Sequence, residues 1–548
     1  MSNFEPTTDQ LNAIDYSDSM VVIAKPGSGK TYVVSEKIRS ILPDLLAHQG
    51  VIAISYTNKA STELKKRSTG NGINQNSSFF GTIDKFCDVE IIIPFLSQMW
   101  GRPTEEITVT KISNLGEEEQ KPFSDIQLDQ VSIDDLEAHL EIVKSYFQKG
   151  LLFLETNGAL ALYVLTNSAA CQNYVRSRYS HIFIDEYQDS GLEQHQLFLK
   201  LKELGLIAVA VGDADQSIFQ FSGKDSKHLL ELAKSNEFKS FSVDINHRCH
   251  PSIVNYSMRL LDEGASLLNA DECHVFYQSI DGNQESIAAW IDARIENLRG
   301  QYDVKKNCEI GILAKGDVSG SLVAAALKTK HRYFVKHPLE DHFSLWARLF
   351  CQLLTYRFDK SVTAQEIIDD SPASLSRSEI QEIRKVIRQL RMIKQVDLAG
   401  PIVAIAEMLL PNGRTDEAVH LLKDSLTDDL ANSFEPASDD EVQIMSLHKS
   451  KGLEFDIVFH LDMYEWILPA KIPGPNSDFD NPVYPSLEQD IKLHYVGITR
   501  ARKACFLCTS SRRGARDFNT GQPVARNGSP SDFLRINKLD ELRKPSPF

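Results

Sequence analysis

The chain has 548 residues, of which 42% are hydrophobic and 24% are charged, and its formal net charge is −16. This composition is typical of packed globular domains and excludes a fibrous or disordered protein, and the length predicts several domains of roughly 100–200 residues each. An acidic balance argues weakly against a nucleic-acid-binding protein, although a local groove can carry the opposite charge. No apolar run approaches the roughly 18–20 residues needed to cross a bilayer, and the polar start MSNFEPTTDQ does not look like a signal peptide. Because eight cysteines also fit a reducing compartment, we expect a cytoplasmic protein.

The first informative segment is a strand, a glycine-rich loop and a helix in that order. The apolar run 20–24 predicts a buried strand, KPGSGKT follows at 25–31, and apolar residues then recur at helical spacing through Val34, Ile38 and Ile41. This is the context that a phosphate-binding P-loop requires. A glycine-rich turn without a ligand is the alternative, but the flanking strand and helix favour the P-loop.

The residue types of this loop indicate nucleotide chemistry. Gly27 and Gly29 let backbone amides face phosphate oxygens, and the helix N-terminus adds its positive dipole end. We expect Lys30 to reach the β- and γ-phosphates and Thr31 to hold Mg²⁺ through its hydroxyl. The predicted nucleotide-binding loop comprises Ala24, Lys25, Pro26, Gly27, Ser28, Gly29, Lys30 and Thr31.

Two further predicted strands end in polar loops. Residues 181–184 are followed by DEYQD at 185–189, where Asp185 is expected to bind Mg²⁺ and Glu186 to activate the attacking water. The apolar run 206–211 is followed by GDADQS, in which Gln216 is placed to sense the γ-phosphate or orient water. Ligands bind at the carboxyl ends of such parallel strands, so the three units predict an NTPase core.

Eight segments, two of which contain the polar loops just described, extend from residue 10 to about residue 508. They are Gln10 in TTDQLNAI, ISYTNKASTELKKR at 54–67, FGTIDKF at 80–86, DEYQD at 185–189, VGDADQSIFQFSGKD at 211–225, INHRCH at 245–250, VQIMSLHKSKGLEFDIVF at 442–459 and LHYVGITRARK at 493–503. In this order they resemble the Q motif, motif Ia, the GTFHS element, the DEFQD element, motif III, the NYRS motif, motif V and motif VI of the UvrD/Rep-type helicases of superfamily 1. A P-loop kinase or a switch GTPase would have no use for motifs Ia, V and VI.

The resemblance implies that ATP binds between two RecA-like domains. The first would supply Lys30, Thr31, Asp185, Glu186 and Gln216, and the second Arg500, Glu454 and Lys451. In the family, the arginines matching Arg248 and Arg500 contact the γ-phosphate, the residue matching Glu454 contacts the ribose, and Gln10 would read adenine. A surface arginine or a solvated glutamate is the alternative at these positions. Arginine suits phosphoryl transfer because its planar fork spreads charge over the equatorial oxygens.

The resemblance also implies contacts with single-stranded DNA. Aromatic side chains at Tyr56, Phe219 and Phe221 would stack on bases, a sequence-tolerant mode of binding, although aromatic residues there could instead belong to a core. Asn58, Thr82 and His448 would touch the backbone or couple DNA to ATP.

Some residues depart from the family pattern. Tyr32 and His247 stand where an arginine and a tyrosine usually sandwich adenine, so stacking remains available but nucleotide preference is open. Ser222 replaces an arginine on the DNA side, and Ile491 and Lys492 replace a common pair of arginines. None of these changes removes a catalytic group.

The spacing of the motifs predicts the domain organisation. We expect an α/β fold of two RecA-like P-loop NTPase domains with parallel sheets, and two inserted, mainly helical subdomains. The expected boundaries are 1–88 and 179–262 for the ATP-binding domain 1A, 89–178 for 1B, 263–345 and 441–548 for 2A, and 346–440 for a reduced 2B.

Three smaller patterns complete the prediction. In 2B an apolar stripe through Ile383 and Ile387 predicts a helix that begins with the capping box Ser376–Glu379. Its basic residues Arg384, Lys385, Arg388, Arg391 and Lys394 indicate a solvated face, with duplex contact as the alternative. Cys505 and Cys508 lie in an apolar run, which favours a strand over a zinc site. About 45 residues follow motif VI, so we expect no fused nuclease domain.

These features predict an ATP-driven, single-stranded-DNA translocase and 3′-to-5′ DNA helicase that uses ATP and Mg²⁺. The alternative is a DNA-sensing ATPase subunit of a nuclease-containing complex, in DNA repair or anti-phage defence, with little processive unwinding. The second hypothesis rests on the small 2B and the missing nuclease, and the chain resembles in scale the helicase-like subunit of Gabija-type defence systems. The expected partners are single-stranded or tailed duplex DNA and, under the alternative, a separate nuclease subunit.

Overall fold

The computed structural model describes residues 5–56, 58–105, 107–112, 115–128, 131–216, 226–335, 337–342, 344–369, 376–411, 414–427, 431–475, 478–516 and 523–547. The chain forms two compact units. Unit 1 contains Met1–Ile245 and Pro338–Leu426, and unit 2 contains Asn246–His337 and Thr427–Phe548. Each unit is built around its own parallel sheet, which confirms the predicted fold class of two RecA-like α/β domains.

The sheet of unit 1 has the strand order β3-β2-β6-β7-β1-β8, and every neighbouring pair is parallel. Its strands are β1 (Met20–Ala24), β2 (Gly50–Ile54), β3 (Phe79–Gly81), β6 (Tyr179–Ile184), β7 (Ile207–Gly212) and β8 (Lys239–Val243). In the pairing register Ile23 of β1 faces Gly212 of β7, and Ile54 of β2 faces Ile184 of β6. The loops that follow β1, β6 and β7 therefore leave the same edge of the sheet.

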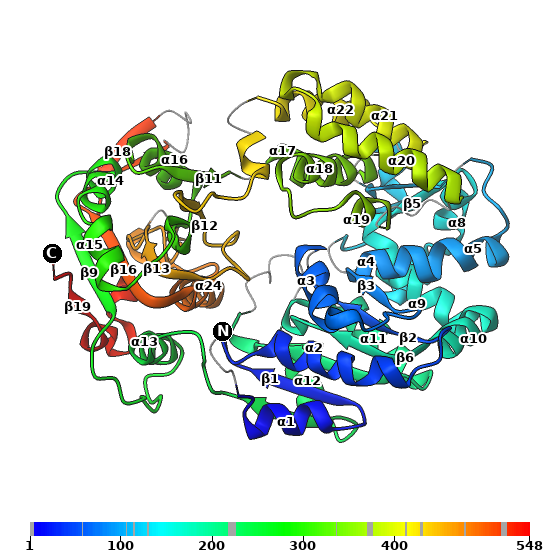
Figure 1. Cartoon of the computed structure of the whole chain (residues 1–548), viewed down its shortest axis with the longest axis horizontal. Helices are drawn as coiled ribbons and strands as arrows, with labels where there is room; N and C mark the ends of the chain where they lie inside the picture. The colour runs from blue at the N-terminus through cyan, green and yellow to red at the C-terminus, as the bar shows by residue number, and fades with distance from the viewer. Residues whose placement is uncertain are drawn as a thin grey trace. The chain divides into compact units, whose positions relative to one another are not determined.

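Alternating side chains bury the two faces of this sheet against different helices. Val22, Val51 and Phe183 pack with α1 (Thr8–Asp15), α2 (Lys30–Ile41) and α3 (Asn58–Ser68). Residues such as Val21 and Ile52 pack on the opposite face, whose helices are α9 (Asn157–Asn167), α10 (Ala169–Arg178), α11 (Leu192–Glu203) and α12 (Lys227–Lys234) (Figure 1). Burial on both faces explains the nearly continuous apolar runs that predict β1, β6 and β7.

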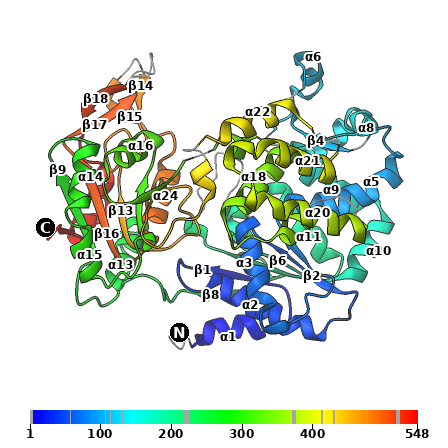
Figure 2. The ribbon, with the colours of Figure 1, turned by 45° about the horizontal axis from the view of Figure 1, so that its top comes forward.

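Unit 1 also contains two largely helical segments, of which the second lies in the sequence between the two parts of unit 2. The first comprises α4 (Ile83–Phe86), a π-helical stretch (Cys87–Ile92), α5 (Ile93–Trp100), β4 (Thr108–Thr110), α6 (Glu117–Gln120), α7 (Ile133–Ala138), α8 (Leu140–Gln148) and β5 (Leu151–Phe153). The second comprises α17 (Pro338–Asp341), α18 (Leu345–Phe358), α19 (Ala364–Asp369), α20 (Arg377–Gln389), α21 (Ala399–Leu409) and α22 (Asp416–Ser425). Figure 2 shows α18, α20, α21 and α22 packed as a bundle.

Helix α20 confirms the predicted stripe and cap. Ser376 accepts a hydrogen bond from Glu379 N, and the Glu379 carboxylate accepts one from Ser376 N, forming the capping box. Ile383 and Ile387 are buried, as the apolar periodicity requires.

Unit 2 contains a second parallel sheet, with the order β11-β12-β10-β13-β16-β9-β19. Its strands are β9 (Val275–Ile280), β10 (Ile310–Ala314), β11 (His331–Phe334), β12 (Val442–Ser446), β13 (Phe455–His460), β16 (Ala501–Ser510) and β19 (Lys544–Pro545). Its helices include α13 (Pro251–Leu261), α14 (Gln284–Asp292), α15 (Ile295–Gln301), α16 (Asp317–Ala326) and α24 (Leu487–Thr499). Two antiparallel pairs, β14 (Ile472–Gly474) with β15 (Asp478–Val483) and β17 (Arg512–Arg516) with β18 (Pro523–Asn527), complete the unit.

Two details of unit 2 bear on the sequence predictions. Helix α13, which the expected boundaries place in domain 1A, packs on α24, β9 and β16, and the division between the units falls before Asn246. Cys505 and Cys508 are fully buried free thiols in β16, which confirms the strand prediction. Within the part of the chain that the structure describes, no helix has the length and apolarity of a membrane crossing.

A buried pair of histidines connects motif VI on α24 to the end of β13 in unit 2. His494 Nδ1 lies 3.1 Å from His460 Nε2, and both side chains are completely buried. Burial lowers the pKa of His460 to about 4, and burial together with the nearby His460 lowers the pKa of His494. Both imidazoles are therefore neutral in the folded chain near neutral pH.

This pair is expected to make the stability of unit 2 fall on acidification. Between the unfolded pKa of about 6.5 and the folded value, the unfolded state binds a proton that the folded state excludes, so stability decreases as pH falls. For His460 alone the loss at pH 5 is about 2 kcal/mol. Urea unfolding at pH 7 and pH 5 should show a smaller acid loss in His460→Asn than in the unchanged chain. Equal losses would contradict the assignment.

Candidate active site

The loop between β1 and α2 has the backbone geometry of an anion-binding turn. Gly27 and Gly29 adopt φ values of +70° and +86°, in the left-handed region that favours glycine. A Cβ at Gly29 would lie 2.7 Å from Gln10 Nε2, so a side chain there would clash as well as strain the backbone. Gly29 caps α2 without a side-chain hydrogen bond, which leaves the amides of the first turn directed to the end where an anion can bind.

Gln10 braces this loop from helix α1. Its side chain is fully buried, its Oε1 accepts a hydrogen bond from Thr7 N (2.8 Å), and its Nε2 donates one to the Ser28 carbonyl (2.7 Å). The structure therefore gives Gln10 a supporting role in the P-loop, while its expected reading of adenine stays a prediction. Tyr32 follows Thr31 in the first turn of α2 and is half-buried.

Two carboxylates follow β6 beside the start of α2. Thr31 Oγ1 donates to Asp185 Oδ2 over 3.3 Å, which brings the two expected Mg²⁺ ligands together. Glu186 adopts a left-handed conformation with φ +59°, and its carboxylate accepts a hydrogen bond from Gln188 Nε2. Burial and the neighbouring Glu186 raise the pKa of Asp185 to about 6, against the opposing charge of Lys30.

A third carboxylate, Asp213, comes directly after β7 and was not among the predicted site residues. Lys30 Nζ lies 3.9 Å from Asp213 Oδ2, and both side chains are largely buried. Gln216 Nε2 donates to the same carboxylate over 2.8 Å, and burial raises the pKa of Asp213. Asp213 follows its strand as Asp185 follows β6, so this position in the sequence could have identified it.

Gln188 connects the loops after β6 and β7 and was also missed. It is fully buried, donates to the Glu186 carboxylate, and accepts from Asp213 N over 2.9 Å. A further ion pair connects the loops after β1 and β7: Lys25 Nζ lies 2.5 Å from Asp215 Oδ2. The structure therefore brings together five predicted residues, which are Lys30, Thr31, Asp185, Glu186 and Gln216. Gln188 and Asp213, which were not predicted, connect them.

In unit 2 the two predicted arginines have different surroundings. Arg500 is only 2% exposed, and its Nε and Nη1 donate to the carbonyls of Val496 and Leu453 (3.1 and 3.2 Å). Arg248 Nη2 forms an ion pair with Glu454 Oε1 at 2.5 Å. Two side chains that were predicted to contact the nucleotide thus pair with each other in this structure. His247, the proposed adenine neighbour, is exposed.

Part of the predicted DNA-contacting set lies at a pocket in unit 1. Tyr56 and Thr82 follow β2 and β3 and line a pocket of about 440 Å³ that also includes Asp185, Glu186 and Arg348. Tyr56 is 37% exposed, and the Thr82 hydroxyl caps α4 by accepting from Lys85 N (3.4 Å). Phe219, Phe221, Ser222 and the side chain of Asn58 lie outside the described residues. His448 is exposed in the turn after β12 of unit 2.

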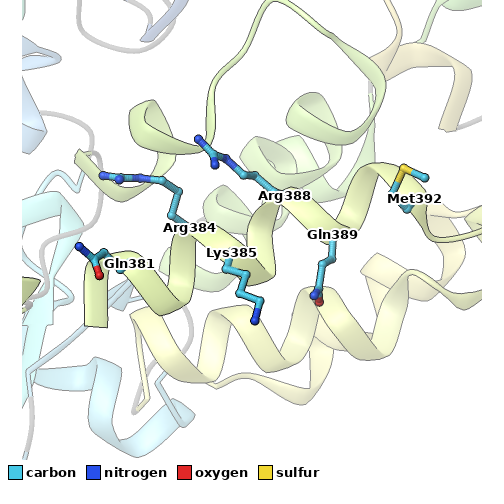
Figure 3. A pocket seen from close by; sticks show the side chains of 6 residues that line it. All are labelled: Gln381, Arg384, Lys385, Arg388, Gln389 and Met392. Atoms are coloured by element: carbon cyan, nitrogen blue, oxygen red, sulfur yellow. The ribbon is translucent and has the colours of Figure 1, made fainter. Parts of the chain in front are cut away.

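The basic residues of α20 divide into two groups. Arg391, just beyond the helix, donates to the carbonyls of Tyr356, Asp359 and Val362. It thus connects the end of α20 to the last turn of α18 and the loop that follows it. Figure 3 shows Arg384 and Arg388 pointing to one side of α20 and Lys385 to the other, around a pocket of about 450 Å³ that Gln381, Gln389 and Met392 complete. Lys385 and Arg388 are exposed, as a solvated face requires.

Comparisons with known proteins agree with this geometry. Residues 10–222 match the family described as AAA domain, and residues 355–512 match the family described as UvrD-like helicase C-terminal domain. The two matches and the similar proteins below support a UvrD/Rep-type helicase of superfamily 1. It is accordingly an ATP-hydrolysing enzyme of the UvrD-like helicase class.

Similar proteins from several bacteria include a Gabija protein and two proteins named as ATP-dependent DNA helicases. Gabija protein GajB of Bacillus cereus (strain VD045) is 27% identical over 90% of this chain and 94% of its own length. ATP-dependent DNA helicase Rep of Buchnera aphidicola subsp. Schizaphis graminum is 22% identical over 96% of this chain and 95% of its own. ATP-dependent DNA helicase PcrA of Staphylococcus aureus (strain Mu50) is 20% identical, with 96% and 85% covered.

Proposed function

We propose that this UvrD/Rep-type chain is an ATP-driven translocase on single-stranded DNA that unwinds duplexes in the 3′-to-5′ direction. The observation that carries the proposal is the assembly of Lys30, Thr31, Asp185 and Glu186 at one edge of the unit 1 sheet, in a chain with the helicase motifs in family order. The relatives named as ATP-dependent DNA helicases support the same substrates, ATP and DNA.

Each residue of the assembly has a role that follows from its surroundings. Lys30 supplies a largely buried positive charge for the β- and γ-phosphates, and the amides at the start of α2 add a second positive end. Glu186 is the proposed base for the attacking water, oriented by Gln188. Lys30 and Gln216 both contact the Asp213 carboxylate, so loss of the γ-phosphate from Lys30 can alter the contacts of the loop after β7.

The residues present also fit a magnesium ion. Thr31 and Asp185 offer a hydroxyl and a carboxylate oxygen 3.3 Å apart, which are the hard oxygen donors that Mg²⁺ prefers. When bound, the ion would offset the negative charge of the phosphates.

The functional test uses DNA with a single-stranded tail at one end. The unchanged chain should hydrolyse ATP faster with single-stranded DNA and displace a strand from a 3′-tailed duplex but not from a 5′-tailed one. Lys30→Ala is the matched inactive control, because it removes the charge that stabilises phosphoryl transfer. Displacement from the 5′-tailed duplex alone would overturn the proposed direction.

Stacking of Tyr56 on a base provides a separate prediction. Tyr56→Ala should weaken DNA binding at that site by ~1–3 kcal/mol, about five- to a hundredfold, because a ring no longer covers a base. Tyr56→Phe keeps the ring and should behave like the unchanged chain. DNA-stimulated ATPase, basal ATPase and thermal melting on the same preparations separate stacking from folding. A stable Tyr56→Ala chain with full DNA stimulation would refute the contact.

A second candidate function is supported by the comparison with GajB. The alignment covers 94% of that protein and 90% of this chain, so the two have nearly the same extent. On this reading the chain is a DNA-sensing ATPase subunit that works with a separate nuclease, in anti-phage defence, with little processive unwinding. Purification from the native host tests it: a nuclease in constant stoichiometry favours the complex, and a solitary chain that unwinds DNA favours the first proposal.

A further inference from the structure

A cluster of metal-binding side chain types lies behind the DEYQD loop. His195 on α11 and His228 on α12 stack with ring centroids 4.6 Å apart, and Glu231 lies one turn along α12 from His228. One potential ligand atom from each of the three residues lies within 4.8 Å of the others. Among the residues that the structure describes, these three form the group of His, Cys, Asp or Glu side chains whose ligand atoms come this close together.

The distances within the cluster suit a small divalent ion. His228 Nδ1 and Glu231 Oε2 are 3.2 Å apart, close to the roughly 3.3 Å edge of a tetrahedron with metal–ligand bonds of about 2.0 Å. For all three side chains to reach one ion, the ring of His195 or that of His228 must rotate. Glu231 can adjust to this rotation because its side chain is 49% exposed.

The state and support of His195 also suit a ligand. Burial and the neighbouring His228 lower the pKa of His195 to about 4, so its imidazole is neutral near pH 7, which is the form that binds metal. Its Nδ1 lies 2.8 Å from the hydroxyl of Tyr187, a fully buried residue of DEYQD. A hydrogen bond on one ring nitrogen that orients the other is the usual support of a metal-binding histidine.

We propose that His195, His228 and Glu231 form a zinc site that joins α11 to α12. Two imidazoles and one carboxylate are a known zinc donor set, with water completing the tetrahedron. With water in its fourth position the site is open, unlike zinc sites closed by four protein ligands. It links the helices that follow β6 and β7, and through the His195–Tyr187 contact it stabilises the DEYQD loop. It is separate from the nucleotide phosphates and does not depend on the proposed helicase activity.

The test measures zinc binding by the full-length chain after removal of metals with a chelator. Titration with zinc chloride should give one zinc per chain, and zinc should raise the melting temperature. Glu231→Gln and His228→Gln should each weaken binding at least about tenfold. Cobalt(II) in place of zinc should show the intense visible absorption of tetrahedral coordination in the unchanged chain and not in Glu231→Gln or His228→Gln.

His274→Gln is the matched control. His274 also stacks on a histidine, His250, with centroids 3.7 Å apart, and its Nε2 lies 3.5 Å from Glu272, but this pair is in unit 2. The control should bind zinc like the unchanged chain. Because the half-exposed Glu231 can be replaced without opening the core, a folded Glu231→Gln chain with unchanged zinc affinity would overturn the site. So would a chain that takes up no zinc, which would leave the stacked histidines held by hydrogen bonds alone.

Discussion

Replacement of Arg500 by alanine is expected to lower kcat by about 10³-fold or more while ATP affinity changes little. An arginine acting on the γ-phosphate works mainly in the transition state, where such residues contribute about 10³–10⁵ in rate. Steady-state kinetics with saturating DNA measures both parameters. Intact kcat with a raised KM would instead assign Arg500 to ground-state binding.

The burial of Arg500 requires two controls in this experiment. Its guanidinium donates to the carbonyls of Val496 and Leu453, so alanine also removes packing and hydrogen bonds. Arg500→Lys retains the charge but loses the planar fork, and it should still lose most of kcat. Arg502→Lys, two residues along the chain, alters ion pairs with Asp456 and Glu309 and should retain activity. Thermal melting of each variant separates lost catalysis from lost folding.

Replacement of Glu186 by glutamine is expected to slow ATP hydrolysis at least ~10²-fold, the usual scale for loss of a general base. Glutamine has nearly the same shape and can still pair with Gln188, so ATP should bind normally. Single-turnover hydrolysis and binding of a fluorescent ATP analogue measure the two properties separately. Glu203→Gln, an exposed residue paired with Lys200 on α11, is the matched control. Turnover at the parental rate with DNA present would show that another group is the base.

The sequence alone predicts those features whose residues are close together in the chain. The strand, glycine turn and helix around residues 20–41 occur as expected, because local spacing decides both the buried strand and the positive-φ turn at Gly27 and Gly29. The capped helix α20 and the buried strand that contains Cys505 and Cys508 follow from the same kind of local pattern. The order of motifs extends this to the family and to two α/β domains.

The tertiary structure decides which distant residues share a site. Gln10 meets Ser28, Lys30 meets Asp213, and Arg248 meets Glu454, and no spacing in the sequence indicates these pairs. Parallel strand order β6-β7-β1 brings together loops more than 150 residues apart in sequence, since hydrogen bonding between strands is independent of their separation along the chain. The same packing buries Asp185 and Asp213, and burial raises their pKa values. The chemistry of single residues can thus be read from the chain, whereas their partners and their solvation are set only when the sheet assembles.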